Sequence, residues 1–315
     1  MSSATRPGGA AFYAAEVYRR LGADVHVATV VGEDFAHDEA LAGCPHWVVR
    51  RGRTTTFSNV YTPAGARIQL VDAVAPAVTP ERLPVDWRDF DVVHLAPIMG
   101  EVDISAWRAA VSARRWVISV QGWLRRLGVS LDHAARVALV GAEAAAWARG
   151  RQVLPRPWPG GDGDGPAPRG RGGPGGERGG RRASGYLDAA LLSEEDLAGQ
   201  GALLDRLRAA AAVVVLTAGV RGAVVYERDP CRATRVGVFP AREVDATGAG
   251  DTFAAAFSVH YGASAAAVEA ARFGAAAASI AIEAAGTDAL DRLSETHARA
   301  GRVPILGPVA ATEAR

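Results

Sequence analysis

The chain has 315 residues, 49% of them hydrophobic, and a formal net charge of +1 at pH 7. This length and composition suffice for one large α/β domain with a sizeable core, residues 1–315. The balanced charge gives no electrostatic case for binding nucleic acid or an acidic membrane surface. No apolar run reaches the length of a membrane span, the first residues do not resemble a signal peptide, and Cys44 and Cys231 have no metal-binding spacing. We therefore expect a cytoplasmic protein.

The sequence contains no lysine, so all 35 basic residues other than histidine are arginine. This absence excludes a Walker-A lysine, the catalytic lysine of protein kinases and any mechanism that passes through a lysine Schiff base. A phosphate site in this chain must therefore be built from backbone amides, arginine or a metal ion.

The N-terminal part begins with a glycine turn, Pro7-Gly8-Gly9, which leads into a helix that reaches about Leu21 and stops at Gly22. A strand is expected at 25–31. The alternating Thr, Val and Tyr residues between 47 and 73, interrupted by a Pro/Gly turn, predict a β-hairpin. From the residues alone this hairpin is either an ordinary sheet edge or a lid over a ligand.

The middle of the chain alternates between strands and helices. Apolar runs at 91–97 and 116–120 flank a helical pattern near 102–113, which predicts a βαβ unit with parallel strands. Glu101 and Gln121 follow the ends of these strands, where such sheets bind ligands, but ordinary loop roles explain both residues as well. An alanine-rich helix is expected at 132–149, followed by a Gly/Pro/Arg-rich insert at 155–182 whose composition predicts disorder.

The C-terminal half continues this alternation. A strand at 187–192 runs into Ser193, a good N-cap before the acidic helix start that holds Glu195 and Asp196. A continuous apolar run at 212–217 predicts a buried parallel strand. After a glycine-rich loop near 248 come two helices, 251–261 and 264–284, separated by Gly262, and a loosely ordered tail from Gly301.

The glycine-rich loop near residue 248 has more groups that could bind a ligand or take part in catalysis than any other motif in the sequence. A β-favouring approach ending at Val244 leads through Gly248 and Gly250 into an apolar helix that begins near Asp251. The first turn of a helix has unpaired N–H groups and the positive end of the macrodipole, so it favours an anion. A carboxylate at that place can accept a proton from a hydroxyl while the amides hold developing negative charge. The alternative is that Asp251 only caps the helix.

The string Asp-x-Thr-Gly-Ala-Gly-Asp-x-Phe at 245–253 resembles the C-terminal signature of the ribokinase-like (PfkB) carbohydrate kinases. The resemblance covers most of the chain from Gly8 to about Leu293. It implies an α/β fold, a ribokinase-like doubly wound three-layer sandwich with a small β lid at about 47–73. It also implies ATP-dependent phosphorylation of a hydroxyl of a small sugar, polyol or nucleoside.

Specific roles follow from the same resemblance. Asp251 would be the general base, and the amides of Gly248, Ala249 and Gly250 would form the anion hole. The turn at 217–222 is similar to a family turn that contacts nucleotide phosphates, which implies cofactor-binding roles for Thr217, Gly219, Arg221 and Gly222, together with Thr247. Asp196 and Glu195 stand where the family organises Mg²⁺, and Asp245 with Thr247 would frame a site for a monovalent cation such as K⁺. Substrate contacts would fall on Gly8, Gly9, Tyr13 and Asp251, and the lid offers a homodimer contact.

Two features depart from the family pattern. Tyr13 stands where the family has an asparagine five positions after the first glycine, and only six residues precede Pro7, where the family has a strand that carries a substrate-binding aspartate. A relative that binds nucleotide or sugar without turnover is therefore the alternative function. A nucleotide-binding oxidoreductase is a further alternative, but no Gly-x-Gly-x-x-Gly follows a first strand.

Overall fold

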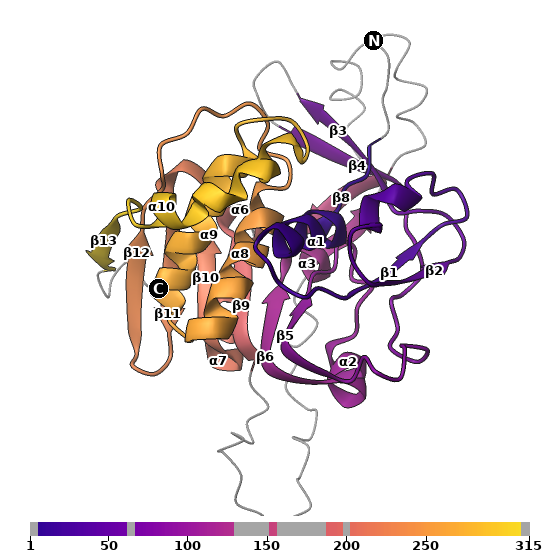
Figure 1. Cartoon of the computed structure of the whole chain (residues 1–315), viewed down its shortest axis with the longest axis horizontal. Helices are drawn as coiled ribbons and strands as arrows, with labels where there is room; N and C mark the ends of the chain where they lie inside the picture. The colour runs from indigo at the N-terminus through magenta and orange to yellow at the C-terminus, as the bar shows by residue number, and fades with distance from the viewer. Residues whose placement is uncertain (1–5, 62–66, 129–150, 156–186, 198–201, 310–315) are drawn as a thin grey trace, which may run out of the picture.

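A mixed seven-stranded sheet forms the centre of the computed structural model, which describes residues 6–61, 67–128, 151–155, 187–197 and 202–309 (Figure 1). Four strands are parallel to one another, and three antiparallel strands extend one side of the sheet. The order across the sheet is β13 (Ile305–Pro308), β12 (Arg232–Val236), β11 (Ala223–Glu227), β10 (Ala211–Thr217), β9 (Leu187–Ser193), β6 (Ser112–Ser119) and β5 (Asp89–Leu95).

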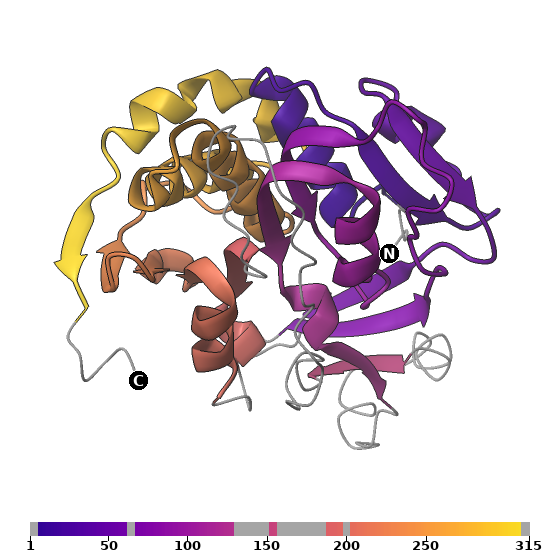
Figure 2. The same ribbon diagram turned by 90° about the horizontal axis from the view of Figure 1, so that it is seen from below.

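Helices cover both faces of this sheet, which explains the apolar runs of its parallel strands. Successive residues of β10 divide between two cores. Val213 and Val215 pack with Phe253 and Phe257 on one face, whereas Val214 and Leu216 pack with the other cluster. Figure 2 shows helices on opposite sides of the strands. The layers contain α8 (Ala249–Ser264) and α9 (Ala267–Ala281) on one face, and α2 (Ile104–Ala110) and α7 (Leu203–Ala210) on the other. The predicted three-layer α/β sandwich is confirmed.

The first helix, α1 (Ala10–Arg20), begins and ends on glycines as the sequence predicts. Its N-cap Gly9 has φ +85°. At the other end Gly22, at φ +80°, forms a Schellman motif, since its amide donates to Arg19 and the next amide donates to Tyr18. The Tyr18 hydroxyl lies 3.0 Å from His94 Nδ1 on β5, and this contact ties α1 to the sheet.

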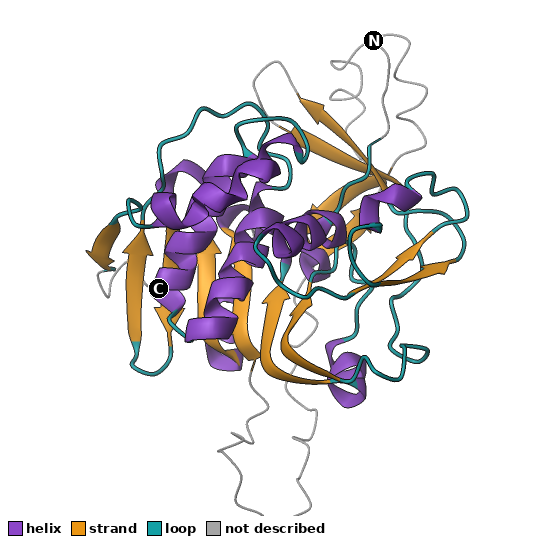
Figure 3. Cartoon of the chain, viewed as in Figure 1, coloured by secondary structure: helices purple, strands orange, loops and turns teal. Residues whose placement is uncertain are grey.

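The hairpin predicted within residues 47–73 is present, but it does not extend over the whole of that range. β3 (Thr56–Tyr61) and β4 (Arg67–Ala73) pair antiparallel as expected. Their sheet also contains β8 (Arg151–Pro155) and β7 (Arg125–Gly128), in the order β3-β4-β8-β7, and Figure 3 shows β3 and β4 lying apart from the large sheet. Residues 47–50 do not belong to it, because β2 (His46–Arg50) pairs in parallel with β1 (Val27–Val31) in a separate two-stranded sheet.

Two further expectations for the C-terminal part are wrong. Gly262 does not break the helix, because α8 continues to Ser264 and Gly262 serves as a point of close approach, where a side chain would collide with Val92 on β5. The helix ends instead at Ala265, whose φ is +57°. The segment after Gly301 is also ordered as far as residue 309, because β13 pairs with β12.

The predicted helix at 132–149 and all but the first residue of the predicted insert at 155–182 lie outside the described residues.

No helix in the described ranges has both the length and the apolar composition that crossing a bilayer requires.

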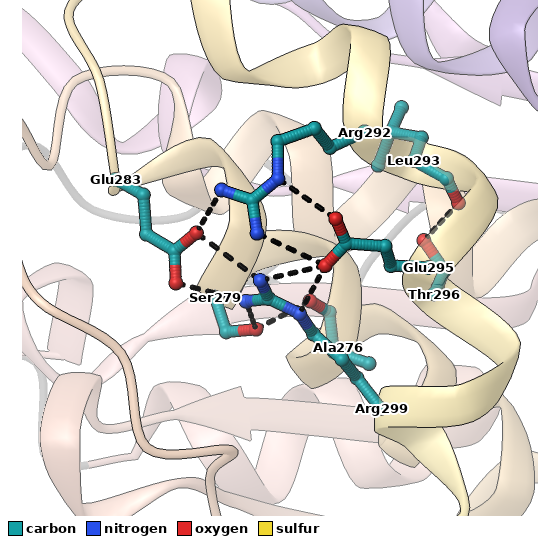
Figure 4. Close-up of polar contacts among 8 residues, drawn as sticks. All are labelled: Ala276, Ser279, Glu283, Arg292, Leu293, Glu295, Thr296 and Arg299. Atoms are coloured by element: carbon teal, nitrogen blue, oxygen red, sulfur yellow. Dashed lines mark hydrogen bonds and ion pairs between the residues drawn. The ribbon is translucent and has the colours of Figure 1, made fainter.

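A charged network holds the C-terminal helices together (Figure 4). Arg299 in α10 (Thr296–Ala300) is only 7% exposed, and it donates to Glu283 Oε1 at 3.0 Å, to Glu295 Oε2 at 2.9 Å and to Ser279 Oγ at 3.1 Å. Arg292, in the 3₁₀ segment η4 (Asp288–Glu295), binds the same two carboxylates from the solvent side. The network thereby fixes the turn that follows α9.

Replacing the buried Arg299 should lower the stability of the fold much more than replacing the exposed Arg292. Arg299→Ala leaves Glu283 and Ser279 without their buried partner, so we expect it to lower the free energy of unfolding by about 3 kcal/mol. Arg292→Ala is the matched control, since its side chain is 48% exposed, and it should leave the denaturation midpoint nearly unchanged. Urea denaturation of both variants measures this difference. Equal loss in the two variants would show that the network does not support the fold.

Candidate active site

The carboxyl ends of the parallel strands meet at one edge of the large sheet. Ser193 at the end of β9 is in register with Thr217 at the end of β10, and Ser119 of β6 pairs beside Leu191. Open α/β sheets bind ligands beyond this edge. The residues that follow these strand ends are therefore the first candidates for a site.

Helix α8 points its N-terminus at the same edge. Near its other end, the Tyr261 hydroxyl donates to the Asp188 carbonyl at the start of β9, and Arg114 near the start of β6 donates to the Gly262 carbonyl. The helix therefore runs antiparallel to the strands. With 16 residues at ~1.5 Å each, it spans about the length of a seven-residue strand. The 248–251 loop consequently lies at the carboxyl edge.

The start of α8 leaves two amides available. Its N-cap Gly248 has φ +80°, and a side chain at that position would press into the Tyr13 ring, with only 2.5 Å to its Cε1. The Ala249 amide donates to the Ala246 carbonyl at 3.2 Å, and within the described part of the chain the amides of Gly250 and Asp251 have no acceptor. An anion would satisfy both of them. Of the amides predicted to form an anion hole, that of Ala249 donates within the loop, so an anion here would be bound by the amides of Gly250 and Asp251.

Asp251 itself occupies the first turn of α8, where protein covers most of the residue but leaves part of its surface exposed. Burial raises its pKa to about 6, and the positive charge of Arg125 opposes that rise. A carboxyl group with this pKa is largely ionised at neutral pH and is still basic enough to accept a proton from a hydroxyl group during reaction. The geometry therefore fits a general base beside an anion-binding helix terminus.

Arg125 is a site residue that the sequence analysis did not select. It follows α3 (Gln121–Leu124), which begins directly beyond the end of β6. Its guanidinium donates to the Ile98 carbonyl at 3.2 Å, lies 5.5 Å from the centre of the Phe57 ring on β3, and acts electrostatically on Asp251. Arg125 thus connects the small sheet to the buried carboxylate. Its position just past a strand end, in a chain without lysine, was the signal that would have identified it.

The loop before α8 is braced by Asp245. Its carboxylate accepts the Thr247 amide at 2.9 Å, while the amides of Val244 and Asp245 donate to the Ile282 carbonyl. Burial alone would raise the pKa of Asp245, but hydrogen bonds from Thr247 and Gly286 and the charge of Arg6 outweigh it and lower the pKa. The turn that receives this loop is the one fixed by the Arg299 network.

A second group of predicted residues gathers at the ends of β9 and β10. Ser193 and Asp196 form a reciprocal cap, because Asp196 Oδ2 accepts both the amide and the hydroxyl of Ser193 at 2.8 Å, and the Asp196 amide approaches Ser193 Oγ at 3.3 Å. The helix they cap is the single turn α6 (Glu194–Leu197). Glu194 forms an ion pair with Arg221, which connects this cap to the 217–222 turn.

The 217–222 turn depends on its glycines. Gly219 and Gly222 both have positive φ, +55° and +84°, and a side chain at Gly222 would collide with the Val236 carbonyl. Thr217 donates its hydroxyl to the Leu192 carbonyl at 3.3 Å. Arg221 keeps a 71% exposed side chain despite its pairing with Glu194. The turn, η3 (Gly219–Arg221), therefore presents backbone and an arginine to solvent, as a phosphate site would require.

The described residues contain no preformed cluster of metal-ligating side chains at the predicted metal sites. Among the described residues, no three carboxylate, histidine or cysteine side chains are grouped closely enough to hold a metal ion. Mg²⁺ commonly takes only one or two carboxylates and completes its shell with water and phosphate oxygens. Asp196 and Glu195 fit that mode, with Asp196 Oδ2 already engaged by Ser193.

The N-terminal glycine turn reaches the same region from the opposite side. Tyr13 packs against Gly248, and its pKa is raised first by burial and then by the charges of Asp245 and Asp251. Gly8 and Gly9 line a large cavity that does not include Asp251. Glu101 accepts the amides of Ile98 and Met99, so it has the loop role that the sequence left open.

Comparison with known proteins agrees with this arrangement. Residues 188–292 match the family model described as pfkB family carbohydrate kinase, and this segment contains the 217–222 turn, Asp245 and the start of α8. No curated protein matches the chain in sequence.

Solved structures match over nearly the whole chain. The nucleoside kinase of Methanocaldococcus jannaschii, an archaeal member of the ribokinase family, is 14% identical with a TM-score of 0.60, and the match covers 96% of this chain and 92% of that one. Arabidopsis thaliana ribokinase, complexed with ribose and ATP, is 17% identical with a TM-score of 0.60, covering 95% and 90%. A pyrophosphate-dependent kinase in the ribokinase family, complexed with a pyrophosphate analog and myo-inositol, is 17% identical with a TM-score of 0.63, covering 91% of each.

The fold of the chain is thus that of the ribokinase-like kinases, with its separate small sheets. Its segment 188–292 is similar to the pfkB family of carbohydrate kinases, which are phosphotransferases.

The two glycines at the start of α8 should respond oppositely to alanine. Gly248→Ala places a side chain against the Tyr13 ring at a positive φ, so we expect it to lower the free energy of unfolding by more than ~1 kcal/mol. Gly250→Ala meets no atom within 4 Å, and alanine is the better helix former by ~1 kcal/mol, so stability should be kept or raised. Thermal unfolding compares the two variants, and a destabilised Gly250→Ala with a normal Gly248→Ala would contradict the loop geometry.

Burial of Asp251 should also make the free energy of unfolding depend on pH. Its pKa is about 6 in the fold against 3.8 in the reference state, so the native state favours the protonated carboxyl. Stability is therefore lost as the pH rises from about 4 through 6, by up to ~2–3 kcal/mol. Asp251→Asn removes this loss, and its advantage over the natural protein should grow between pH 4 and 7.

Chemical denaturation at several pH values measures this advantage. Asp205→Asn, at a position with a 72% exposed side chain, is the control for removal of a carboxylate at the surface. A constant difference for Asp251→Asn would mean that the carboxyl group has an ordinary pKa.

Proposed function

We propose that this chain transfers a terminal phosphoryl group to a hydroxyl of a small sugar, polyol or nucleoside, with Asp251 as the general base. The observation that carries this proposal is the pairing of a buried, basic carboxylate with two amides that have no acceptor in the described part of the chain, at the N-terminus of α8. The match of residues 188–292 to the pfkB family supports the same reaction class.

Each part of the site has a task in this reaction. Asp251 takes the proton of the acceptor hydroxyl, the oxygen attacks the terminal phosphorus, and the bond from that phosphorus to the rest of the donor breaks. The amides of Gly250 and Asp251 stabilise the negative charge of the transferred group. Arg125 keeps the carboxylate ionised near neutral pH, since its charge opposes the effect of burial.

The donor side would lie at the 217–222 turn. Gly219 and Arg221 present exposed backbone and positive charge at this sheet edge, while Thr217, whose hydroxyl donates to the Leu192 carbonyl, and the buried Gly222 shape the turn. Asp196 and Glu195 would hold Mg²⁺ together with phosphate oxygens, and the ion would neutralise charge on the donor. ATP is the donor we propose; pyrophosphate, used by one structural relative, is the competing donor that an experiment must include. Thr247 and Asp245 would frame a K⁺ site.

The acceptor would lie between the glycine turn and Asp251. Gly8, Gly9 and Tyr13 would contact it: Tyr13 packs against Gly248 and brings a phenol hydroxyl where an asparagine was expected. The small sheet contributes Phe57, which contacts Arg125 and would help to exclude water. The same sheet is the proposed homodimer contact.

A binding protein without turnover is the second candidate. Tyr13 favours it, because the tyrosine ring occupies the loop side of Gly248, where a substrate would approach the amides. Protection of the chain from thermal unfolding by nucleotide, without any product release, would identify this function.

Phosphoryl transfer is tested by measuring ADP or phosphate release with ATP or pyrophosphate, Mg²⁺ and panels of sugars, polyols and nucleosides. We expect acceptor-dependent release, reduced ~10²–10⁴-fold in Asp251→Asn, because that range is typical for loss of a general base. Asp205→Asn, distant from the site in sequence and exposed, should keep full activity. Release that is insensitive to Asp251→Asn would contradict the mechanism.

The pH dependence gives a separate test. Since Asp251 must be ionised to accept a proton, kcat/KM should rise with pH through an apparent pKa near 6 and then level off. Arg125→Gln removes the charge that lowers the pKa of Asp251, so the midpoint should move to higher pH. A profile that is flat between pH 5 and 7 would exclude Asp251 as the titrating base.

A further inference from the structure

A row of three polar side chains takes no part in the steps of the proposed reaction. The Tyr18 hydroxyl on α1 lies 3.0 Å from His94 Nδ1 on β5, and His94 Nε2 lies 2.9 Å from Ser119 Oγ on β6. Ser119 is the last residue of β6. The row therefore runs from the first helix to the carboxyl edge of the sheet, where the candidate active site lies.

The row lies on the face of the sheet that α8 covers. His94 is in register with Val117 on the neighbouring strand, so the two side chains point to the same face. Val117 packs in the same core cluster as Phe257 of α8. Side chains two residues apart on a strand share a face, so Ser119 also points toward α8.

Two displacements toward the carboxyl edge place Ser119 beneath the turn that contains Asp251. On β6, Ser119 lies two residues past Val117, which is ~6–7 Å closer to that edge. On α8, which runs antiparallel to the strands, Asp251 lies about two turns before Ser258, the residue that interacts with the Tyr18 hydroxyl. Two turns amount to ~11 Å toward the same edge and keep both side chains on one face of the helix.

The loop after β5 connects this place to the acceptor side of the site. Ile98 Cδ1 lies 3.6 Å from where a side chain on Gly9 would begin, and the Ile98 carbonyl accepts Arg125 at 3.2 Å. Arg125 in turn acts on the charge of Asp251. These contacts bring the glycine turn and Arg125 to the ends of β5 and β6, where Ser119 lies.

Each member of the row can both donate and accept a hydrogen bond. Burial lowers the pKa of His94 to about 4 and raises the pKa of Tyr18, so both side chains are neutral at physiological pH. If Tyr18 donates to Nδ1, then Nε2 donates to Ser119, and the hydroxyl hydrogen of Ser119 is available to a ligand. In the reverse order Ser119 donates to Nε2, and its oxygen is available to accept.

This reversibility selects the kind of group that fits. Among the described residues, Ser119 Oγ has His94 as its one hydrogen-bond partner. A ligand hydroxyl also donates and accepts, so it matches both orders of the row, whereas a carboxylate or an ammonium group matches one order alone.

We propose that Ser119 binds a second hydroxyl group of the acceptor, one that is not phosphorylated, and that His94 and Tyr18 are the residues that position Ser119. The acceptor is thus a polyhydroxylated molecule held at two points, with its reacting hydroxyl at Asp251 and another hydroxyl at Ser119. This inference rests on the proposed function, because Asp251 defines where the reacting hydroxyl lies.

Ser119→Ala tests the contact, with ribose and myo-inositol, the ligands of two structural relatives, as probes. We expect the KM for the acceptor to rise ~2–10-fold, the effect of losing one hydrogen bond between neutral groups, while the KM for the donor stays unchanged. The acceptor concentration that gives half of the maximal rise in Tm, measured without any donor, should increase by the same factor.

Tyr18→Phe tests the positioning role. It should raise the KM for the acceptor as well, and the double variant with Ser119→Ala should be no worse than Ser119→Ala alone, because Tyr18 acts through Ser119. Trp107→Phe is the matched control for loss of a buried hydrogen bond, since Trp107 Nε1 donates to the Val78 carbonyl at 3.0 Å in the core of the opposite face. It should lower the Tm without changing the KM for the acceptor.

The outcomes separate this inference from the proposed function. Turnover with an unchanged KM for the acceptor in Ser119→Ala, equal rises in the KM values for donor and acceptor, or additive effects of Ser119→Ala and Tyr18→Phe would overturn the inference alone. Binding of a probe that depends on Ser119, without turnover, would support the inference and contradict phosphoryl transfer. Neither binding nor turnover with either probe would contradict both.

Discussion

The opposition between burial and the Arg125 charge at Asp251 is the constraint on which the proposed site depends. Burial raises the pKa of this carboxyl group, and the Arg125 charge limits the rise to about 6. Arg125 donates to the Ile98 carbonyl and lies over Phe57, so one side chain couples the small sheet, the loop after β5 and the start of α8. The loop on the other side of Asp251 is fixed through Asp245 and Ile282 to the turn that the Arg299 network supports.

The fold was largely predictable because its signals are local and periodic. The continuous apolar runs of β9 and β10 and the glycines at both ends of α1 correspond directly to structure. Gly262 was misread because a glycine that breaks a helix and a glycine that lets a helix approach a strand look alike in sequence; the collision with Val92 is visible only in three dimensions. The lid was overextended for the same reason, since the pairing of β2 with β1 is a tertiary choice.

The candidate site could be predicted where its residues form one contiguous sequence motif. It could not be predicted where residues distant in sequence come together only in the fold. The string at 245–253 selected Asp251 as a candidate and predicted the helix start near it, and the structure begins α8 at Ala249. The position of Arg125 just past a strand end marks it as a candidate, but its electrostatic effect on Asp251, which is distant in sequence, depends on the tertiary fold. Ser193 and Asp196 show that a sequence pattern can have two explanations. The pair resembles a family element that organises Mg²⁺, and it also forms a local helix cap through its own hydrogen bonds.

Among the described strands, β1 and β5 each have one edge without a pairing partner, and a cavity lies between them. Cavities lined by apolar side chains cost on the order of 24 cal/mol per Å³. A dry void of about 870 Å³ would therefore cost more than the ~5–15 kcal/mol that keep a typical domain folded. That space is therefore not a dry void. The N-terminal glycine turn, which we propose as a contact of the acceptor, lines the same cavity.

The most direct test of this account is the titration of the Asp251 carboxyl group in the folded protein. Carbon-13 NMR of aspartate carboxyl groups, with the Asp251 resonance assigned by its absence in Asp251→Asn, gives the pKa without reference to any substrate. A midpoint near 6 that falls together with the midpoint of the activity profile would support Asp251 as the general base. A midpoint near 3.8, the ordinary value, would show that protein does not cover the carboxylate as described and would contradict the account.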